Sequence, residues 1–235
     1  MAGALTVLSM GVLLGLQHAT DGDHVVAVST IVARERRIAP AARIGALWGL
    51  GHSATVLLAG GAMVLSGVVL PERVALALEL GVAFMLVILG LTGARRALAA
   101  ARSSRGAHGA DRGHGHQHGA VAVDRRGWLR PVGVGLVHGL AGSAALALAV
   151  LATVRDRALA TAYLGVFCVG TILGMSLVTA ALSTPLAVAS RRLAPSVLHR
   201  VALAAGVLSV GFGLWLGYRI GIVEGLFLGV AGASP

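Results

Sequence analysis

The sequence has no lysine, only one cysteine and few acidic residues. Cys168 has no second cysteine to pair with, so an intramolecular disulfide and a thiolate metal cluster are both excluded. The phosphate-loop pattern G-x-x-x-x-G-K-[ST] and the zinc-protease pattern H-E-x-x-H are also missing. Charged residues make up only 12% of the 235 positions, which is too few for a typical soluble domain. These absences argue against a P-loop ATPase and a zincin-type protease, and we expect a protein that is not an enzyme.

Hydrophobic residues account for 57% of the chain and are gathered in long runs. Six apolar segments lie at residues 4–32, 41–69, 73–98, 128–154, 158–189 and 197–220. Each is long enough to cross a hydrocarbon core of roughly 30 Å, which takes about 20 helical residues. The sequence therefore predicts an all-α fold, a polytopic helical membrane protein with six transmembrane helices.

All basic residues are arginines, and the formal net charge is +10. In a soluble protein this balance would suggest nucleic acid, but most arginines lie in the first, third and fifth connections between apolar segments. The positive-inside rule then predicts that these connections are cytoplasmic and that both termini lie outside. We expect a multi-pass protein of the cell (inner) membrane with lipid around it and no nucleic-acid partner. A homo-oligomer is compatible with the sequence.

The two halves of the sequence share short echoes. Residues 15–18, Gly-Leu-Gln-His, return 120 positions later as Gly-Leu-Val-His at 135–138. Two weaker echoes pair Gly51 with Gly174 and Gly90 with Gly213, each 123 positions apart. Because three spans are an odd number, a repeat of three must enter the membrane in the opposite sense. We therefore predict a 3+3 inverted repeat, an architecture typical of secondary transporters.

The repeat divides the chain into three parts. Residues 1–101 form the first transmembrane repeat of three helices, and residues 128–235 form the second, with three helices and an apolar tail. Between them, residues 102–127 are predicted to be a flexible cytoplasmic loop rich in histidine. Such tracts bind metal weakly, and a solvated linker with incidental histidines is the alternative. The auxiliary ligands predicted in this loop are His108, His114, His116 and His118.

The first apolar segment contains the run His-Ala-Thr-Asp-Gly-Asp-His, which starts at His18. Ionisable groups at such depth cost roughly 2.5–3.5 kcal/mol each, and imidazole with carboxylate suits divalent first-row metals. On a straight helix His18 and His24 would point about 120° apart, so we predict a helix broken near Gly22. Two histidines that only fix helix packing are the alternative. The metal ligands predicted here are His18, Asp21, Asp23 and His24.

Two further histidines lie within apolar segments. His52 follows Gly49 and Gly51, which permit close helix approach, and it is predicted to be a further ligand. His138 takes the repeat position of His18 without the carboxylates, so we predict a contribution from the second half to a shared site. A His–Ser hydrogen bond between helices is the alternative for His52, and packing is the alternative for His138.

These motifs resemble those of the nickel/cobalt transporter family. The pattern His-x4-Asp-His at residues 18–24 is similar to that family's first signature, and Leu-Gly-His-Ser at 50–53 resembles its second. The run Gly-Leu-Val-His-Gly-Leu-Ala-Gly-Ser at 135–143 is similar to the branch of urease-accessory-like membrane proteins. Family transporters usually have eight spans, with the first motif in the second span, and carry later acidic signatures that this chain lacks.

The resemblance implies a secondary transporter that moves divalent nickel or cobalt across the cytoplasmic membrane through a midplane His/Asp site. Ni²⁺ or Co²⁺ would be the transported substrate, with no permanently bound cofactor. One alternative is a non-transporting accessory protein that delivers metal for metalloenzyme maturation. Another is a membrane haem or redox protein with histidine axial ligands.

Overall fold

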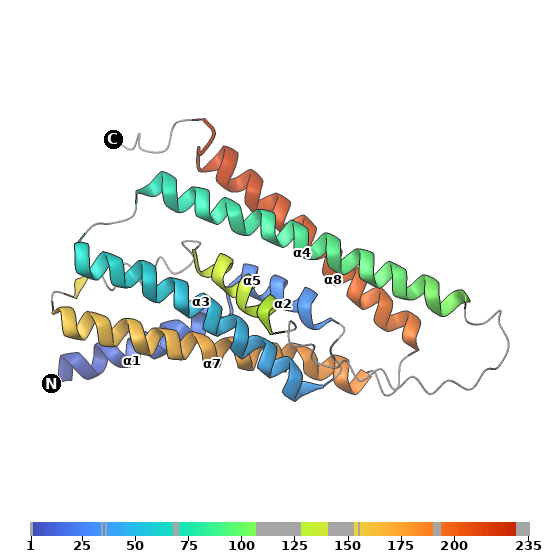
Figure 1. The fold of residues 1–235 in the computed structure, drawn as a ribbon, viewed down its shortest axis with the longest axis horizontal. Coiled ribbons are helices and arrows are strands. Elements are labelled where there is room, and N and C mark those ends of the chain that lie inside the picture. Colours follow the sequence, from blue (N-terminus) through green and yellow to red (C-terminus); the bar gives the residue numbers. More distant parts are fainter. Residues whose placement is uncertain are drawn as a thin grey trace.

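The computed structural model describes residues 2–33, 35, 37–67, 71–106, 128–140, 153–154, 156–189 and 194–228. Within these ranges every regular element is a helix, which confirms the all-α prediction. The helices are α1 (Ala2–His18), α2 (Gly22–Val32), α3 (Ile38–Ser66), α4 (Glu72–Gly106), α5 (Leu129–Leu140), α7 (Arg157–Ala189), α8 (Pro195–Tyr218) and the π-helical turn η2 (Arg219–Val223). They lie side by side in one elongated bundle (Figure 1).

Four of the helices, α3, α4, α7 and α8, are long and apolar enough to cross a membrane. The pair α1 and α2 passes the same test together as one bent span, which gives up to five candidate spans. The predicted count of six is not confirmed, because the segment 128–154 is represented only by α5. With 12 residues, α5 is about 18 Å long, and residues 141–152 lie outside the described ranges.

The first predicted span is broken, as expected. The axes of α1 and α2 differ by 53°, and the break falls on the three residues between them. Thr20 marks the turn, because its backbone N–H and its hydroxyl both donate to the Gln17 carbonyl oxygen, at 2.8 and 2.6 Å. Asp21 is extended at the N-cap of α2 (φ −57°, ψ 147°). The backbone of Gly22 is not left-handed, and Gly22 is the first residue of α2. The break is therefore marked by the side-chain hydrogen bond of Thr20 and not by the conformational freedom of Gly22.

The interior of the bundle contains small and polar side chains beside large ones such as Trp48 and Phe167, whereas many other large apolar side chains face outward. Thr171, Thr179 and Ser209 are fully buried. Leu58 and Leu177, in contrast, are exposed on α3 and α7. This distribution suits a lipid environment, where Ser, Thr and Gly allow helices to approach closely and satisfy polar groups between them.

Glycines bring α1 against α7 and α5 against α3 with the same geometry. A Cβ at Gly15 would collide with the Phe167 carbonyl oxygen and the Thr171 backbone nitrogen on α7. A Cβ at Gly135 would collide with the equivalent atoms of Trp48 and His52 on α3. In both pairs the glycine faces a carbonyl oxygen and the amide four residues later, so the first helix of each half packs on the second helix of the other half.

Two more pairs of contacts share this reciprocity. Gly51 of α3 faces the carbonyl oxygen of Val132 on α5, and Gly170 of α7 faces that of Val12 on α1. The antiparallel helices α4 and α8 meet at Gly90 and Gly206, each of which faces the other's carbonyl oxygen (Figure 1).

The same contacts bear on the register of the sequence echoes. Gly51 faces α5 as Gly170 faces α1, whereas Gly90 and Gly213 face the carbonyl oxygens of Gly206 and Ala83, two partners that are again 123 positions apart. The 3+3 repeat itself stays a prediction.

Candidate metal centre

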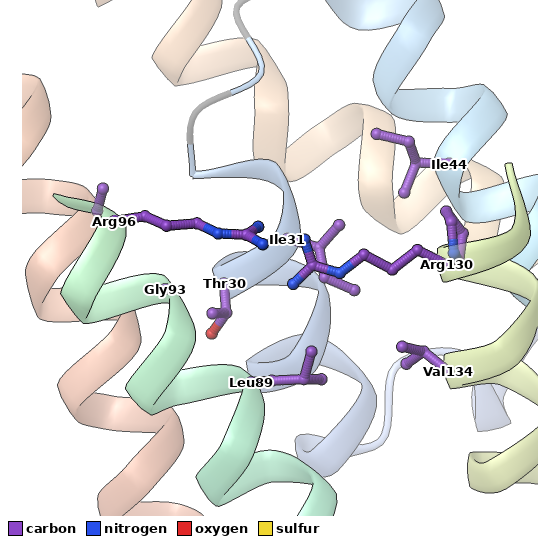
Figure 2. Close-up of a pocket in the computed structure, with 10 residues that line it drawn as sticks. Thr30, Ile31, Ile44, Leu89, Gly93, Arg96, Arg130 and Val134 are labelled. Atoms are coloured by element: carbon purple, nitrogen blue, oxygen red, sulfur yellow. The ribbon is translucent and has the colours of Figure 1, made fainter. Parts of the chain in front are cut away.

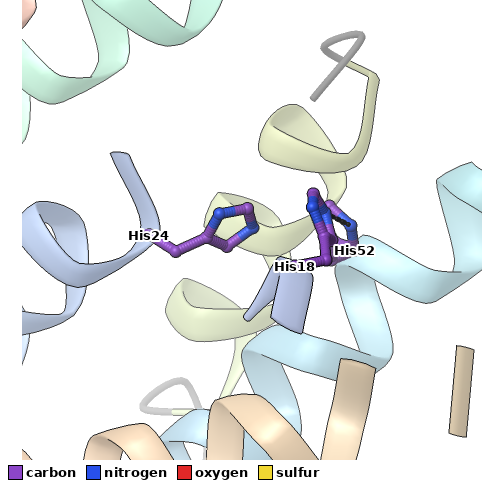
Figure 3. A group of neighbouring side chains, drawn as sticks. All are labelled: His18, His24 and His52. Carbon is purple, nitrogen blue, oxygen red and sulfur yellow. Dashed lines mark hydrogen bonds between the residues drawn. The ribbon is translucent and has the colours of Figure 1, made fainter. Parts of the chain in front are cut away.

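Four buried histidines from four helices meet where α1 ends and α2 begins. His18 is the last residue of α1, His24 lies in the first turn of α2, His52 lies within α3, and His138 lies near the end of α5. His18 is 6% exposed and the other three are 0% exposed. Ring centroids are 4.6 Å apart for His18 and His24, 5.0 Å for His18 and His52, and 4.2 Å for His24 and His138. Figure 3 shows the first three with their rings turned toward one another.

The break between α1 and α2 creates this cluster. On one continuous helix His18 and His24 could not face each other, but across the 53° bend between α1 and α2 their ring centroids lie 4.6 Å apart. The glycine contact at Gly135 holds α5 against α3, so His138 is brought close to His52, with their ring centroids 6.0 Å apart. The cluster therefore depends on both halves of the chain.

Asp23 holds two of the imidazoles. Its Oδ1 accepts hydrogen bonds from the backbone N–H of His24 at 2.9 Å and from the Nδ1 of the same residue at 3.1 Å. Its Oδ2 accepts one from His138 Nε2 at 3.0 Å. If these ring nitrogens carry the protons, each neutral ring keeps its lone pair on the other nitrogen, which is His24 Nε2 and His138 Nδ1. The Asp23 side chain is 15% exposed, so this carboxylate is largely buried with its partners.

Asp21 holds a third imidazole. Its Oδ2 accepts a hydrogen bond from His18 Nδ1 at 2.8 Å, and its side chain is 40% exposed. His18 Nε2 then faces His52 Nε2 at 3.1 Å. Carboxylates in this position typically fix the tautomer of a metal-binding histidine and make the free nitrogen more basic.

Several ring nitrogens of the cluster have no hydrogen-bond partner among the described residues. These are His24 Nε2, His52 Nδ1 and His138 Nδ1. A buried polar atom without a partner costs about 1–3 kcal/mol, and a bound cation could satisfy all three of these nitrogens. Helix packing alone gives them no partner among the described residues, and the ligand roles of the histidines stay predictions.

The ligand atoms form two overlapping groups. One contains His18, His24 and His52, and the other contains Asp23, His24 and His138, with one ligand atom of each residue lying within 4.8 Å of the others in its group. His24 belongs to both. Imidazole nitrogens with one carboxylate match the donor preferences of divalent nickel, cobalt and zinc better than those of Mg²⁺ or Ca²⁺.

Most of the predicted ligands come together, and Asp21 differs from the rest. Its carboxylate is 40% exposed, accepts a hydrogen bond from His18 and is in neither group. The loop histidines at 108, 114, 116 and 118 lie outside the described residues.

Trp48 was not predicted and forms one wall of the site. Its ring centroid lies 5.5 Å from those of both His24 and His138, it is fully buried, and its indole Nε1 has no partner among the described residues. The signal in the sequence was its spacing, because Trp48 precedes His52 by four residues and so shares its face of α3.

The comparisons with known proteins give one informative relative. The urease accessory protein UreH of Bacillus sp. (strain TB-90) is 31% identical to this chain over 225 residues, which is 95% of the length of each protein. No family model matches the chain. No solved structure matches it either.

Proposed function

Because the chain belongs to the nickel/cobalt transporter family, in its urease-accessory-like branch, we propose that it is a secondary transporter of Ni²⁺ or Co²⁺. The relative is matched over nearly its whole length, which confirms the family and agrees with a membrane protein that is not an enzyme. Transport through the buried histidine cluster is part of this proposal. The observation that carries it is the set of unpartnered imidazole nitrogens in two overlapping ligand groups.

We propose that the imidazoles bind the ion and that the two aspartates chiefly orient them. The ion would first be held by His18, His24 and His52, whose rings are turned toward one another (Figure 3). Asp21 and Asp23 would lie behind His18 and His24, and their negative charges would offset the charge of the cation in a low-dielectric interior.

The second ligand group supplies the next position for the ion. Asp23 and His138 share His24 with the first group, so an ion could pass from one group to the other while His24 remains bound. Asp23 would then change from an orienting group to a ligand. This sequence needs no large movement of the ion, because all four rings lie within one cluster.

We propose that the two groups are exposed in turn by rocking of a 3+3 inverted repeat. The reciprocal glycine contacts of Gly15 with α7 and of Gly135 with α3 support this repeat, as does the mutual contact of Gly90 and Gly206. The ligands come from α1, α2 and α3 of the first half and from α5 of the second. A site between repeats is where such transporters hold their substrate.

The proposed orientation keeps both termini outside and residues 102–127 in the cytoplasm. The start of α1 and the end of α8 lie at one end of the bundle, whereas the end of α4 and the start of α8 lie at the other (Figure 1). Arg96 and Arg200 are at this second end, which supports a cytoplasmic assignment for it.

A flux assay tests transport directly. Purified protein in liposomes would take up radioactive nickel or cobalt under an imposed pH gradient, which also tests coupling because protons compete with metal for imidazole. We expect His24→Ala to abolish uptake. His199→Ala is the matched control, because His199 lies on α8 in neither ligand group. Normal uptake by the His24 variant would exclude the proposed path.

A second candidate is an accessory protein that passes metal on without moving it across the membrane. The similarity to a urease accessory protein favours this second candidate. In this alternative the histidine-rich loop at 102–127 would be the delivering part, and the buried cluster would be structural. The two candidates differ in whether the loop or the cluster is indispensable.

A further inference from the structure

A cavity lies between α2, α3, α4, α5 and α8. Its volume is about 220 Å³, and its lining includes Thr30, Ile31 and Leu89 (Figure 2). Val134, which also lines it, lies one helical turn before His138 on α5. None of the proposed metal ligands lines it.

Two arginines from different halves of the chain enter this cavity. Arg96 comes from α4 and Arg130 from α5, and their guanidinium groups extend toward each other over Ile31 (Figure 2). Neither makes an ion pair among the described residues, whose ion pairs all involve other side chains. Two like charges that face each other over apolar walls repel one another unless an anion lies between them.

The other residues that line the cavity include no carboxylate that could neutralise these arginines. Thr30 is its one hydroxyl, and that hydroxyl already donates to the carbonyl oxygens of Val26 and Ala205, at 3.2 and 3.3 Å. The hydrogen-bond donors that remain for a ligand are therefore the two planar guanidinium forks. Such forks match the paired oxygens of a phosphate group better than they match a single-atom anion.

We propose that Arg96 and Arg130 bind the phosphate group of an anion in this cavity. The cavity is several times larger than the roughly 30 Å³ share of a water molecule, so it has room for a tetrahedral oxyanion. Both arginines remain exposed, so the cavity is reached from the surface. In the orientation proposed above, it lies on the cytoplasmic side of the bundle, where the headgroups of anionic lipids collect, and only this step of the argument rests on the proposed function.

The phosphate can come from two sources, an anionic phospholipid or free phosphate. Either would tie α4 to α5 across α2, which is the helix that carries Asp23 and His24. The binding of phosphate does not depend on metal transport, because none of the proposed metal ligands lines this cavity.

The test measures binding of two probes to the purified full-length protein. Inorganic phosphate is titrated in detergent by calorimetry, and retention of phosphatidylglycerol over phosphatidylcholine is measured by native mass spectrometry from mixed nanodiscs. The test variant is Arg96→Gln with Arg130→Gln. The matched control is Arg95→Gln with Arg102→Gln, which removes the same charge from exposed positions on α4 that do not line the cavity.

We expect the test variant to lose at least about tenfold in affinity for the bound probe, and the control variant to keep it. Retention of the lipid alone identifies a headgroup site, and binding of inorganic phosphate identifies a site for a free anion. Binding of neither probe, or an equal loss in both variants, overturns the proposal. Thermal unfolding in detergent shows, without metal, that both variants are folded, and Arg96→Gln alone is expected to weaken binding if the double variant does not fold.

Discussion

His138 Nε2 lies 3.0 Å from Asp23 Oδ2, so two residues 115 positions apart share one hydrogen bond inside the bundle. The other oxygen of the same carboxylate accepts from His24 Nδ1. One acidic side chain therefore sets the orientation of two imidazoles that come from different halves of the chain. Asp21, in contrast, holds only His18 and is 40% exposed.

This difference predicts unequal effects of removing the two carboxylate charges. Asp23→Asn should weaken nickel binding by about 10- to 100-fold, because two histidines lose their orienting partner. Asp21→Asn should weaken it less, since one histidine is affected and water can replace the exposed carboxylate. Calorimetry on protein in detergent measures both, and an equal or larger loss for the Asp21 variant would contradict the assigned roles.

The histidine that the two ligand groups share should be the least replaceable. His24→Ala removes a ligand from both groups, whereas His52→Ala and His138→Ala each leave one group complete. We expect no measurable nickel binding for the His24 variant and weaker but detectable binding for the other two. Equilibrium dialysis with radioactive nickel would show this order, and similar affinities for all three variants would argue against two overlapping groups.

The contact of α5 with α3 should tolerate no side chain at Gly135. A Cβ there would collide with the Trp48 carbonyl oxygen, so Gly135→Ala should lower the free energy of unfolding by about 1–3 kcal/mol. It should also weaken metal binding, because α5 carries His138. Gly133→Ala is the control on the same helix, since a Cβ at Gly133 would contact nothing. Thermal unfolding in detergent measures the two, and equal midpoints would show that the approach is not tight.

Deleting residues 107–119 separates transport from metal delivery. A transporter whose ion passes through the buried cluster should keep its nickel uptake into liposomes, within about twofold of the full-length chain. An accessory protein should lose its effect on urease activation in cells that express the enzyme. Loss of liposome uptake on this deletion would favour the loop over the cluster as the main metal-binding part.

The positions of the long helices were predictable because apolar length alone specifies them. The segments predicted at 158–189 and 197–220 lie close to the helices Arg157–Ala189 and Pro195–Tyr218. The gathering of His18 and His24 was predictable as well, since a straight helix could not serve both and a break could. Polar side chains within an apolar segment need polar partners, and the nearest available partners are one another.

Other features depend on contacts that a sequence does not display. The register between the halves is one of them, because Gly51 has many glycines with which it can be matched, and only the atoms that it faces relate it to Gly170. The role of Asp23 as a holder of two imidazoles needed the position of His138. The approach of Arg96 to Arg130 also joins helices that are distant in sequence.

The exchanged packing of α1 on α7 and α5 on α3 has a consequence for biogenesis. The first helix of each half packs on a helix of the other half. The arrangement is like that of a domain-swapped dimer whose two subunits have been joined into one polypeptide. During synthesis α1 must wait in the membrane, without its main neighbour, until α7 has been inserted. The last ring of the metal centre arrives only with α5, so the second ligand group of Asp23, His24 and His138 stays incomplete until the second half has begun to assemble.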